Sequence, residues 1–215
     1  MSSLLVPYYE HPAVRPAEWA ALLAAAPRLY AVVINPANGA GDHPDPAFAE
    51  TAVRLRAAGV RVLGYADTDY GRRPHPEVVA DLTRHRDWYA VDGAFFDQVP
   101  ATPDAYPHYQ RLASAAWSAG CGTLALNPGT PTHPCYARIA DVLVTFEGPW
   151  STYRTFPTHP GPPPGTHVCH LVYDVPPEAD LTDDARRKGA TLHCAVPGTG
   201  DHPWGTLPHT VRPAR

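Results

Sequence analysis

The chain has 215 residues, 44% of them hydrophobic, and its 17 basic and 21 acidic residues give a formal net charge of −4. This length and composition are typical of one α/β domain over residues 1–215, and the slight negative charge argues against nucleic acids or an anionic membrane as partners. No apolar run reaches the roughly 20 residues that cross a bilayer, and no charged leader precedes the first apolar run. We therefore expect a cytoplasmic monomer, or a secreted one if a leader has been removed.

Eight short β-rich runs recur along the chain, and segments with helical spacing separate the early ones. Two of these segments, 19–26 and 109–117, place apolar residues at positions i, i+3, i+4 and i+7. Asp45 followed by Pro46 is typical of a helix start, and Gly59 and Gly120 are typical of helix ends. The β-rich runs occupy residues 4–8, 31–35, 60–65, 93–97, 123–127, 142–147, 168–173 and 191–196.

This alternation predicts parallel strands joined by right-handed crossovers, and eight such units favour closure into a compact (β/α)8 barrel of the TIM type. The outer ring of helices should be incomplete near the C-terminus. Residues 151–156 form a poor helix, and the segment after Val196 is rich in Pro, Gly and His. We expect those parts to be irregular.

Polar residues collect at the C-terminal ends of the predicted strands, which share one rim in a parallel barrel. Asp97, Asn127 and Glu147 are among them. Because side chains alternate along a strand, Asp97 should lie above Phe95, and Glu147 above Thr145, with both acids facing the barrel mouth. The fourth and sixth strands are separated by one strand, so the two carboxylates can approach to the separation found in glycosidases.

Asp97 and Glu147 together supply the groups that glycosidic bond cleavage requires. One carboxylic acid protonates the leaving oxygen, and a second carboxylate attacks the sugar or activates water. The alternative for either acid alone is that it caps a helix or pairs with an arginine. The polar residues along the whole rim favour the catalytic interpretation.

Several other polar residues are candidates for binding a sugar. Asn35, Asn38 and Asn127 can reach sugar hydroxyls from the rim, although asparagine at such positions also caps helices or fixes turns. Asp67 would suit a cationic amino sugar, and a loop cap explains it equally well. His170, late in the seventh run, is a candidate for orienting a carboxylate or hydroxyl, with a buried core histidine as the alternative.

Aromatic residues near the strand ends are a further group of candidates. Tyr8, Tyr65 and Trp150 offer flat apolar faces for pyranose rings, although core packing explains Tyr65 as well. The 12 histidines and four cysteines show no zinc-ligand spacing, and no glycine-rich phosphate loop follows a strand. We therefore predict an oligo- or polysaccharide ligand, with no metal and no cofactor.

Six motifs occur in order over residues 4–175: LLVPYY, VINPANGAG, AGVRVLGY, WYAVDGAFFD, LNPGT and ADVLVTFEG. On these motifs the chain resembles the spherulin-4-like proteins of spherulation-specific family 4, which are related to microbial galactosaminidase-type glycoside hydrolases. The resemblance implies a (β/α)8 barrel that hydrolyses α-1,4-linked galactosamine or N-acetylgalactosamine polysaccharide. It also implies that Asp97 and Glu147 are catalytic. We take Asp97 as nucleophile or transition-state stabiliser and Glu147 as general acid/base, with the reverse assignment open.

One position departs from the family pattern, which usually reads Phe-Phe-Asp-Glu where this chain has Gln98 after Asp97. Glutamine keeps hydrogen-bonding capacity but does not exchange a proton near neutral pH. Strand alternation predicts that Gln98 points away from Asp97, which favours a supporting or substrate-binding role. The alternative function is a non-catalytic glycan-binding or developmental protein that lost turnover through Gln98.

Overall fold

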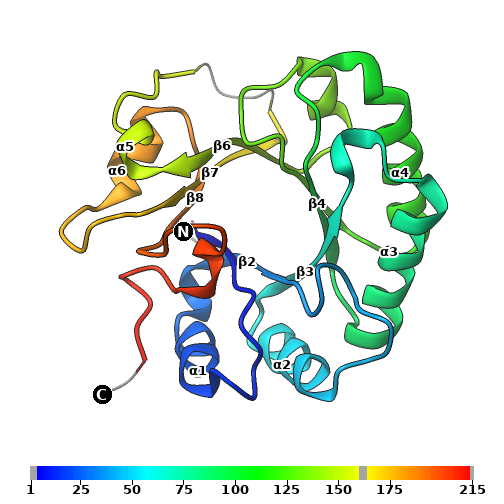
Figure 1. Ribbon diagram of the computed structural model, residues 1–215, viewed down its shortest axis with the longest axis horizontal. Helices are drawn as coiled ribbons and strands as arrows, with labels where there is room; N and C mark the ends of the chain where they lie inside the picture. Colours follow the sequence, from blue (N-terminus) through cyan, green and yellow to red (C-terminus); the bar gives the residue numbers. More distant parts are fainter. Residues whose placement is uncertain (1–3, 160–163, 214–215) are drawn as a thin grey trace.

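The computed structural model describes residues 4–159 and 164–213, and in it eight parallel strands form a closed barrel. Each strand pairs with the next along the chain, and β8 pairs with β1 (Figure 1). The predicted (β/α)8 barrel is confirmed, and each predicted β-rich run overlaps one strand. The strands are β1 (Leu4–Pro7), β2 (Leu29–Ile34), β3 (Arg61–Asp67), β4 (Gly93–Asp97), β5 (Thr123–Leu126), β6 (Val142–Pro149), β7 (His167–Tyr173) and β8 (Leu192–Ala195).

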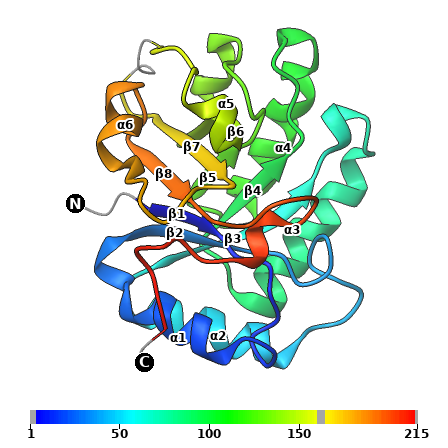
Figure 2. The same cartoon turned by 60° about the vertical axis from the view of Figure 1, so that its left-hand side comes forward.

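The outer helices are long beside the first four strands and short beside the last four (Figure 1). The first four strands are followed by α1 (Pro16–Ala24), α2 (Pro46–Ala57), α3 (His75–Tyr89) and α4 (Tyr106–Ser118). The later strands are followed by the 3-10 helix η4 (Pro134–Arg138), α5 (Trp150–Tyr153), α6 (Leu181–Arg187) and the 3-10 helix η5 (Pro203–Gly205). Figure 2 shows the C-terminal segment, in red, lying over the barrel beside the chain that leaves β1. Among the described residues, no helix is long and apolar enough to span a bilayer.

The predicted helix boundaries coincide with observed caps. The Asp45 carboxylate accepts the backbone N–H groups of Ala47 and Phe48 at 2.8 and 3.2 Å, so it caps α2. Gly59 and Gly120 follow α2 and α4 with φ angles of 79° and 86°. This left-handed conformation is accessible to glycine at little cost, which is why each helix ends there.

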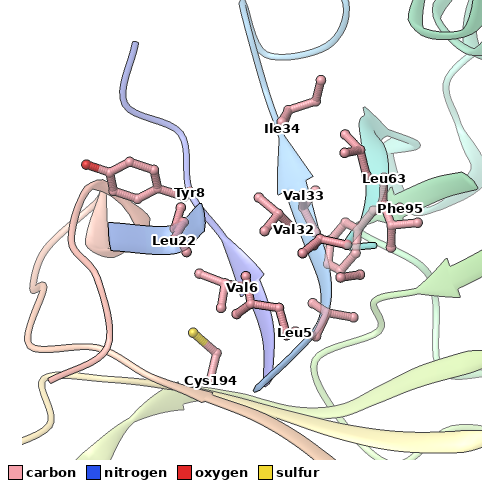
Figure 3. Close-up of a cluster of buried hydrophobic side chains, with 14 of the residues drawn as sticks. Leu5, Val6, Tyr8, Leu22, Val32, Val33, Ile34, Leu63, Phe95 and Cys194 are labelled. Carbon is pink, nitrogen blue, oxygen red and sulfur yellow. The ribbon is translucent and has the colours of Figure 1, made fainter. Parts of the chain in front are cut away.

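Side chains on β4 alternate between the barrel interior and the helix layer, as predicted. Phe95 belongs to a central cluster of buried side chains that also contains Leu5 and Leu63 (Figure 3). Phe96 belongs to a separate cluster formed with α3 and α4. Asp97 continues the inward-facing row above Phe95 and opens into the barrel mouth.

Strand β6 departs from plain alternation at Thr145. Val144 and Phe146 pair with consecutive residues of β7, so Thr145 is an extra residue that forms a bulge. Val144 faces the central cluster, Phe146 packs in an outer cluster, and Glu147 returns to the inside. The prediction that Thr145 lies beneath Glu147 is wrong, because Val144 holds that inward position. Without the bulge, alternation from Val144 would turn Glu147 toward the helices.

Candidate active site

Two acids and one amide meet at the ends of three neighbouring strands. Asp97 is the last residue of β4, Asn127 follows β5 directly, and Glu147 lies near the end of β6. All three line one cavity at the C-terminal rim of the barrel. Sites in this architecture are assembled at that rim, from the ends of different strands.

The Asn127 side chain joins the two acids through a single nitrogen. Its Nδ2 donates to Oδ1 of Asp97 at 2.7 Å and to Oε2 of Glu147 at 2.5 Å. Its Oδ1 accepts the backbone N–H of Gly129 at 3.0 Å, which orients the amide with its NH₂ group toward the acids. The two carboxylate oxygens therefore lie at most about 5.2 Å apart, which is the two donor distances placed end to end.

The remaining oxygen of each acid also accepts a hydrogen bond. The Tyr65 hydroxyl donates to Oδ2 of Asp97 at 2.8 Å, and Nε1 of Trp204 donates to Oε1 of Glu147 at 3.2 Å. Trp204 comes from η5, in the C-terminal segment that lies over the barrel. Both carboxylates are thus oriented from two sides, which fixes where each can deliver or accept a proton.

Burial raises the pKa of both acids, and the charge of Asp97 raises the pKa of Glu147 further. Burial, followed by the charge of Asp97, raises the pKa of Glu147 from 4.5 to about 7, while the hydrogen bonds from Asn127 and Trp204 oppose the shift. Burial also raises the pKa of Asp97, although hydrogen bonds led by that from Tyr65 oppose this. The two groups titrate as a coupled pair, in which Glu147 is the member that holds a proton near neutral pH.

The raised pKa of Glu147 predicts a pH dependence of stability. As pH rises from 4.5 to about 7, the unfolded chain releases a proton that the folded protein keeps. The free energy of unfolding should therefore fall by about 3 kcal/mol across this range, with the stabilisation complete below it and lost above it. Denaturant unfolding from pH 4 to 8 should show a steeper decline for the wild type than for Glu147→Gln. Parallel curves would contradict the assignment.

Two cavities flank the acid pair, and both are lined by Asp97 and Glu147. The larger, of about 540 Å³ and called here the large cavity, is walled by Tyr9, Asn35, Asn38, Tyr65, Tyr173 and Trp204, among others. The smaller, of about 400 Å³ and called here the small cavity, is lined by Tyr70, Gln98, Asn127, Pro128 and Gly129. The described residues that line these cavities include no lysine or arginine. The site is acidic and rich in tyrosine.

Several of the predicted binding residues lie at these cavities. Asn35, Asn38 and Tyr65 line the large cavity, and Gln98 lines the small one. Oδ1 of Asn35 also accepts the backbone N–H of Gly39 at 2.7 Å. Asn35 therefore fixes a turn, which was the alternative to sugar binding, and it also lies in the cavity wall.

Gln98 does not follow the predicted alternation. Strand β4 ends at Asp97, and Gln98 has a left-handed φ of 53°, so both residues line the small cavity. Nε2 of Gln98 donates to Oδ2 of Asp67 at 3.4 Å, and Oδ1 of Asp67 accepts the N–H of Asp69 at 2.7 Å. Asp67 itself is not among the residues that line either cavity. It supports Gln98 and the turn that follows β3.

Three predicted binding residues lie away from the mouth, and the structure corrects their assignment. Tyr8 follows the end of β1 (Figure 3), and it is fully buried. Its ring packs on Trp19 of α1, with the ring centroids 5.1 Å apart. His170 occupies an outward position on β7, where its Nδ1 lies 2.9 Å from the Tyr153 hydroxyl. Trp150 begins α5 and packs on the same outer cluster, with its ring 6.1 Å from that of Tyr153. Tyr8 and His170 are buried in the core, and Trp150 is half-buried against it.

Four aromatic residues at the mouth were not predicted from the sequence: Tyr9, Tyr70, Tyr173 and Trp204. Tyr173 had a usable signal, because it shares the inward parity of Leu171 on β7. Tyr9 had a weaker one, since it lies two residues beyond β1. Trp204 contacts Glu147 across 57 residues of chain, and no local pattern marks it.

The fold and the site define a TIM-type barrel with two acids at its C-terminal rim that accept hydrogen bonds from one shared asparagine. The chain belongs to spherulation-specific family 4, whose family model matches residues 3–209. It is 32% identical to spherulin-4 of Physarum polycephalum over 156 residues, which are 70% of this chain and 46% of that protein. The chain therefore spans about half the length of that relative.

Solved structures are similar to this chain as well. Sph3 of Aspergillus clavatus, in its crystal structure in complex with GalNAc, has a TM-score of 0.77 and 26% identity, and the match covers 96% of this chain and 93% of that one. A chain of the tryptophan synthase complex of Pyrococcus furiosus has a TM-score of 0.55 at 13% identity, with 90% and 87% covered. The second likeness shows the barrel fold alone.

Proposed function

We propose that this protein is a glycoside hydrolase that cleaves α-1,4-linked galactosamine or N-acetylgalactosamine polysaccharide. The observation that carries the proposal is the pair of acids, Asp97 and Glu147, which share one amide donor between two cavities. The similarity to Sph3 in complex with GalNAc supports a sugar of this class. The absence of lysine and arginine among the described lining residues suits a neutral or cationic sugar better than an acidic one.

The separation of the acids supports cleavage with retention of the anomeric configuration. Retaining enzymes hold their carboxyl groups about 5 to 5.5 Å apart, whereas inverting enzymes hold them about 6.5 to 9.5 Å apart. The oxygens of Asp97 and Glu147 that face each other are at most about 5.2 Å apart, because both contact Nδ2 of Asn127. This distance leaves little room for a water molecule between an acid and the sugar.

Each acid then has a defined role in two steps. Glu147 gives its proton to the glycosidic oxygen, the bond from that oxygen to the anomeric carbon breaks, and a carboxylate oxygen of Asp97 bonds to that carbon. Glu147, now ionised, takes a proton from water, and the water oxygen displaces Asp97 from the sugar. The raised pKa of Glu147, about 7, suits a group that both gives and takes a proton near neutral pH.

The proposal is tested with the wild-type protein and a panel of defined oligosaccharides. Incubation with α-1,4-linked galactosamine oligosaccharides, acetylated and deacetylated, should yield shorter reducing sugars by mass spectrometry. Proton NMR during the first turnovers should show the new reducing end as the α anomer. Cleavage of a different amino-sugar polymer in the panel would change the substrate. Binding without cleavage of any member would contradict a hydrolase.

Gln98 favours one second candidate, a glycan-binding protein without turnover. Its side chain lies in the small cavity with both acids, where the family pattern has an ionisable glutamate. If that acid is required, the wild type should bind oligosaccharides without cleaving them, and Gln98→Glu should gain cleavage. If Asp97 and Glu147 are sufficient, the wild type should cleave. Gln98→Glu should then be slower, because the new carboxylate would face Asp67.

A further inference from the structure

Tyr70 is an exposed aromatic side chain beside the acid pair. It is 52% exposed, and it lines the small cavity together with Asp97 and Glu147. Four large apolar side chains are at least half exposed among the described residues: Val14, Val53, Tyr70 and Trp117. Val53 and Trp117 lie on the outer helices α2 and α4, away from the mouth. An aromatic ring that lines a cavity beside two acids, unlike one on an outer helix, is available to contact a ligand there.

The backbone around Tyr70 is strained. Asp69 and Tyr70 have left-handed φ angles of 44° and 53°, and Gly71 follows with 81°. Only the glycine adopts this region without steric cost, because the other two carry a Cβ atom. Strain of this kind persists where surrounding contacts impose it, and it concentrates at binding sites.

Hydrogen bonds tie this strained turn to the strand that carries Asp97. The backbone N–H of Tyr70 donates to the carbonyl oxygen of Gln98 at 2.7 Å. Thr68, which is fully buried, donates from its N–H and its hydroxyl to the carbonyl oxygen of Asp97, at 3.1 and 2.7 Å. The backbone of Tyr70 is therefore held at a fixed position relative to the end of β4, from which the Asp97 side chain extends.

A cation lies beside the ring. The guanidinium of Arg72 lies 5.6 Å from the centroid of the Tyr70 ring, and it pairs with the Asp69 carboxylate. A cation–π contact favours this position of the ring before a ligand binds. A ring that already occupies its bound position loses less rotamer freedom on binding.

We propose that Tyr70 is a stacking platform for a sugar ring in the small cavity. The proposal rests on the function proposed above and adds the contact that holds one of the two sugars flanking the cleaved bond. A phenol ring presents a flat apolar face to the C–H groups of a pyranose, and its hydroxyl remains free to reach a polar partner. Because the acid pair lines both cavities, a glycan that spans them places its glycosidic bond over the acids and one sugar on Tyr70.

Calorimetric titration of the Glu147→Gln variant, which should turn over substrate about a thousandfold more slowly than the wild type, tests the platform. The probes are galactosamine itself and α-1,4-linked galactosamine oligosaccharides of increasing length. In this background Tyr70→Ala should weaken binding of the long oligosaccharides by about tenfold. Tyr70→Phe should restore the binding of the long probes, because it keeps the ring. Trp117→Ala is the matched control, since it removes an equally exposed aromatic ring from α4.

The outcomes separate this proposal from the function on which it rests. If Tyr70→Ala binds every probe as tightly as its parent, or loses affinity that Tyr70→Phe does not restore, the platform is overturned while hydrolysis by the wild type stands. A wild type that binds no oligosaccharide would overturn both proposals. Loss of oligosaccharide affinity in Tyr70→Ala with rescue by Tyr70→Phe would support the platform even if the wild type does not cleave.

Discussion

Replacing Glu147 by glutamine is expected to lower kcat on galactosamine oligosaccharides by about a thousandfold, with little change in their affinity. Glutamine matches the shape of glutamate and can still accept the hydrogen bond from Asn127, but it neither gives nor takes a proton. Initial rates at saturating substrate, together with binding by calorimetry, measure both parts. Glu50→Gln, an exposed change on α2, is the control and should retain the wild-type rate. A Glu147→Gln variant with normal kcat would contradict the assignment.

Chemical rescue assigns the separate roles of the two acids. Glu147→Ala with added azide should give a glycosyl azide of retained configuration, because the anion attacks the sugar after it has been transferred to Asp97. Asp97→Ala with azide should give the inverted product, since the anion then enters the space of the missing nucleophile. Exchanged products would mean that the two acids have exchanged roles.

Replacing Asn127 by alanine is expected to lower kcat by about a hundredfold and to move the pH profile upward. The Asn127 N–H groups lower the pKa of both Asp97 and Glu147, so their loss leaves both acids protonated to higher pH. The wild-type profile of kcat/KM should fall above about pH 7, where Glu147 ionises, and fall again at acid pH, where Asp97 is protonated. In the variant both limbs should lie at higher pH.

Asn35→Ala is the comparison for this measurement. Asn35 is also a rim asparagine, but its side-chain oxygen bonds to Gly39 rather than to either acid. Its loss should affect substrate binding and the turn at Gly39 without moving the limbs of the pH profile. Unchanged limbs in Asn127→Ala would contradict a shared donor, and equal shifts in both variants would indicate a general disturbance of the rim.

The barrel and the acid pair could be predicted because they depend on local pattern. Alternation along β4 places Phe95 inside, Phe96 outside and Asp97 at the mouth, and the structure agrees. The same rule reached the right result for Glu147 for a wrong reason, since the bulge at Thr145 decides its direction. A bulge inserts one residue without a strong local signal, so counting along the strand cannot reveal it.

Contacts between distant segments explain most of the errors. Tyr8 and Trp150 lie just beyond the ends of β1 and β6, where alternation no longer applies. Packing against α1 decides the direction of Tyr8, and packing against the outer cluster of Phe146 decides that of Trp150. Gln98 turns into the cavity because its backbone is left-handed. A hydrogen bond from the backbone N–H of Tyr70 to the carbonyl oxygen of Gln98 supports this conformation. Trp204 reaches Glu147 from a segment whose Pro-rich composition predicts only irregular structure.

The extra residue in β6 separates the direction of Glu147 from plain counting along the strand. A chain that lacked Thr145 would keep Val144 inside, Phe146 outside and Glu147 inside, because the remaining residues already pair in order with β7. A chain of the present length that paired without the bulge would instead turn Glu147 toward the outer layer, and it would carry the complete motif with one carboxylate at the mouth instead of two. The pairing of Glu147 with Leu171 is therefore a better mark of a homologue with both acids in place than the presence of the glutamate.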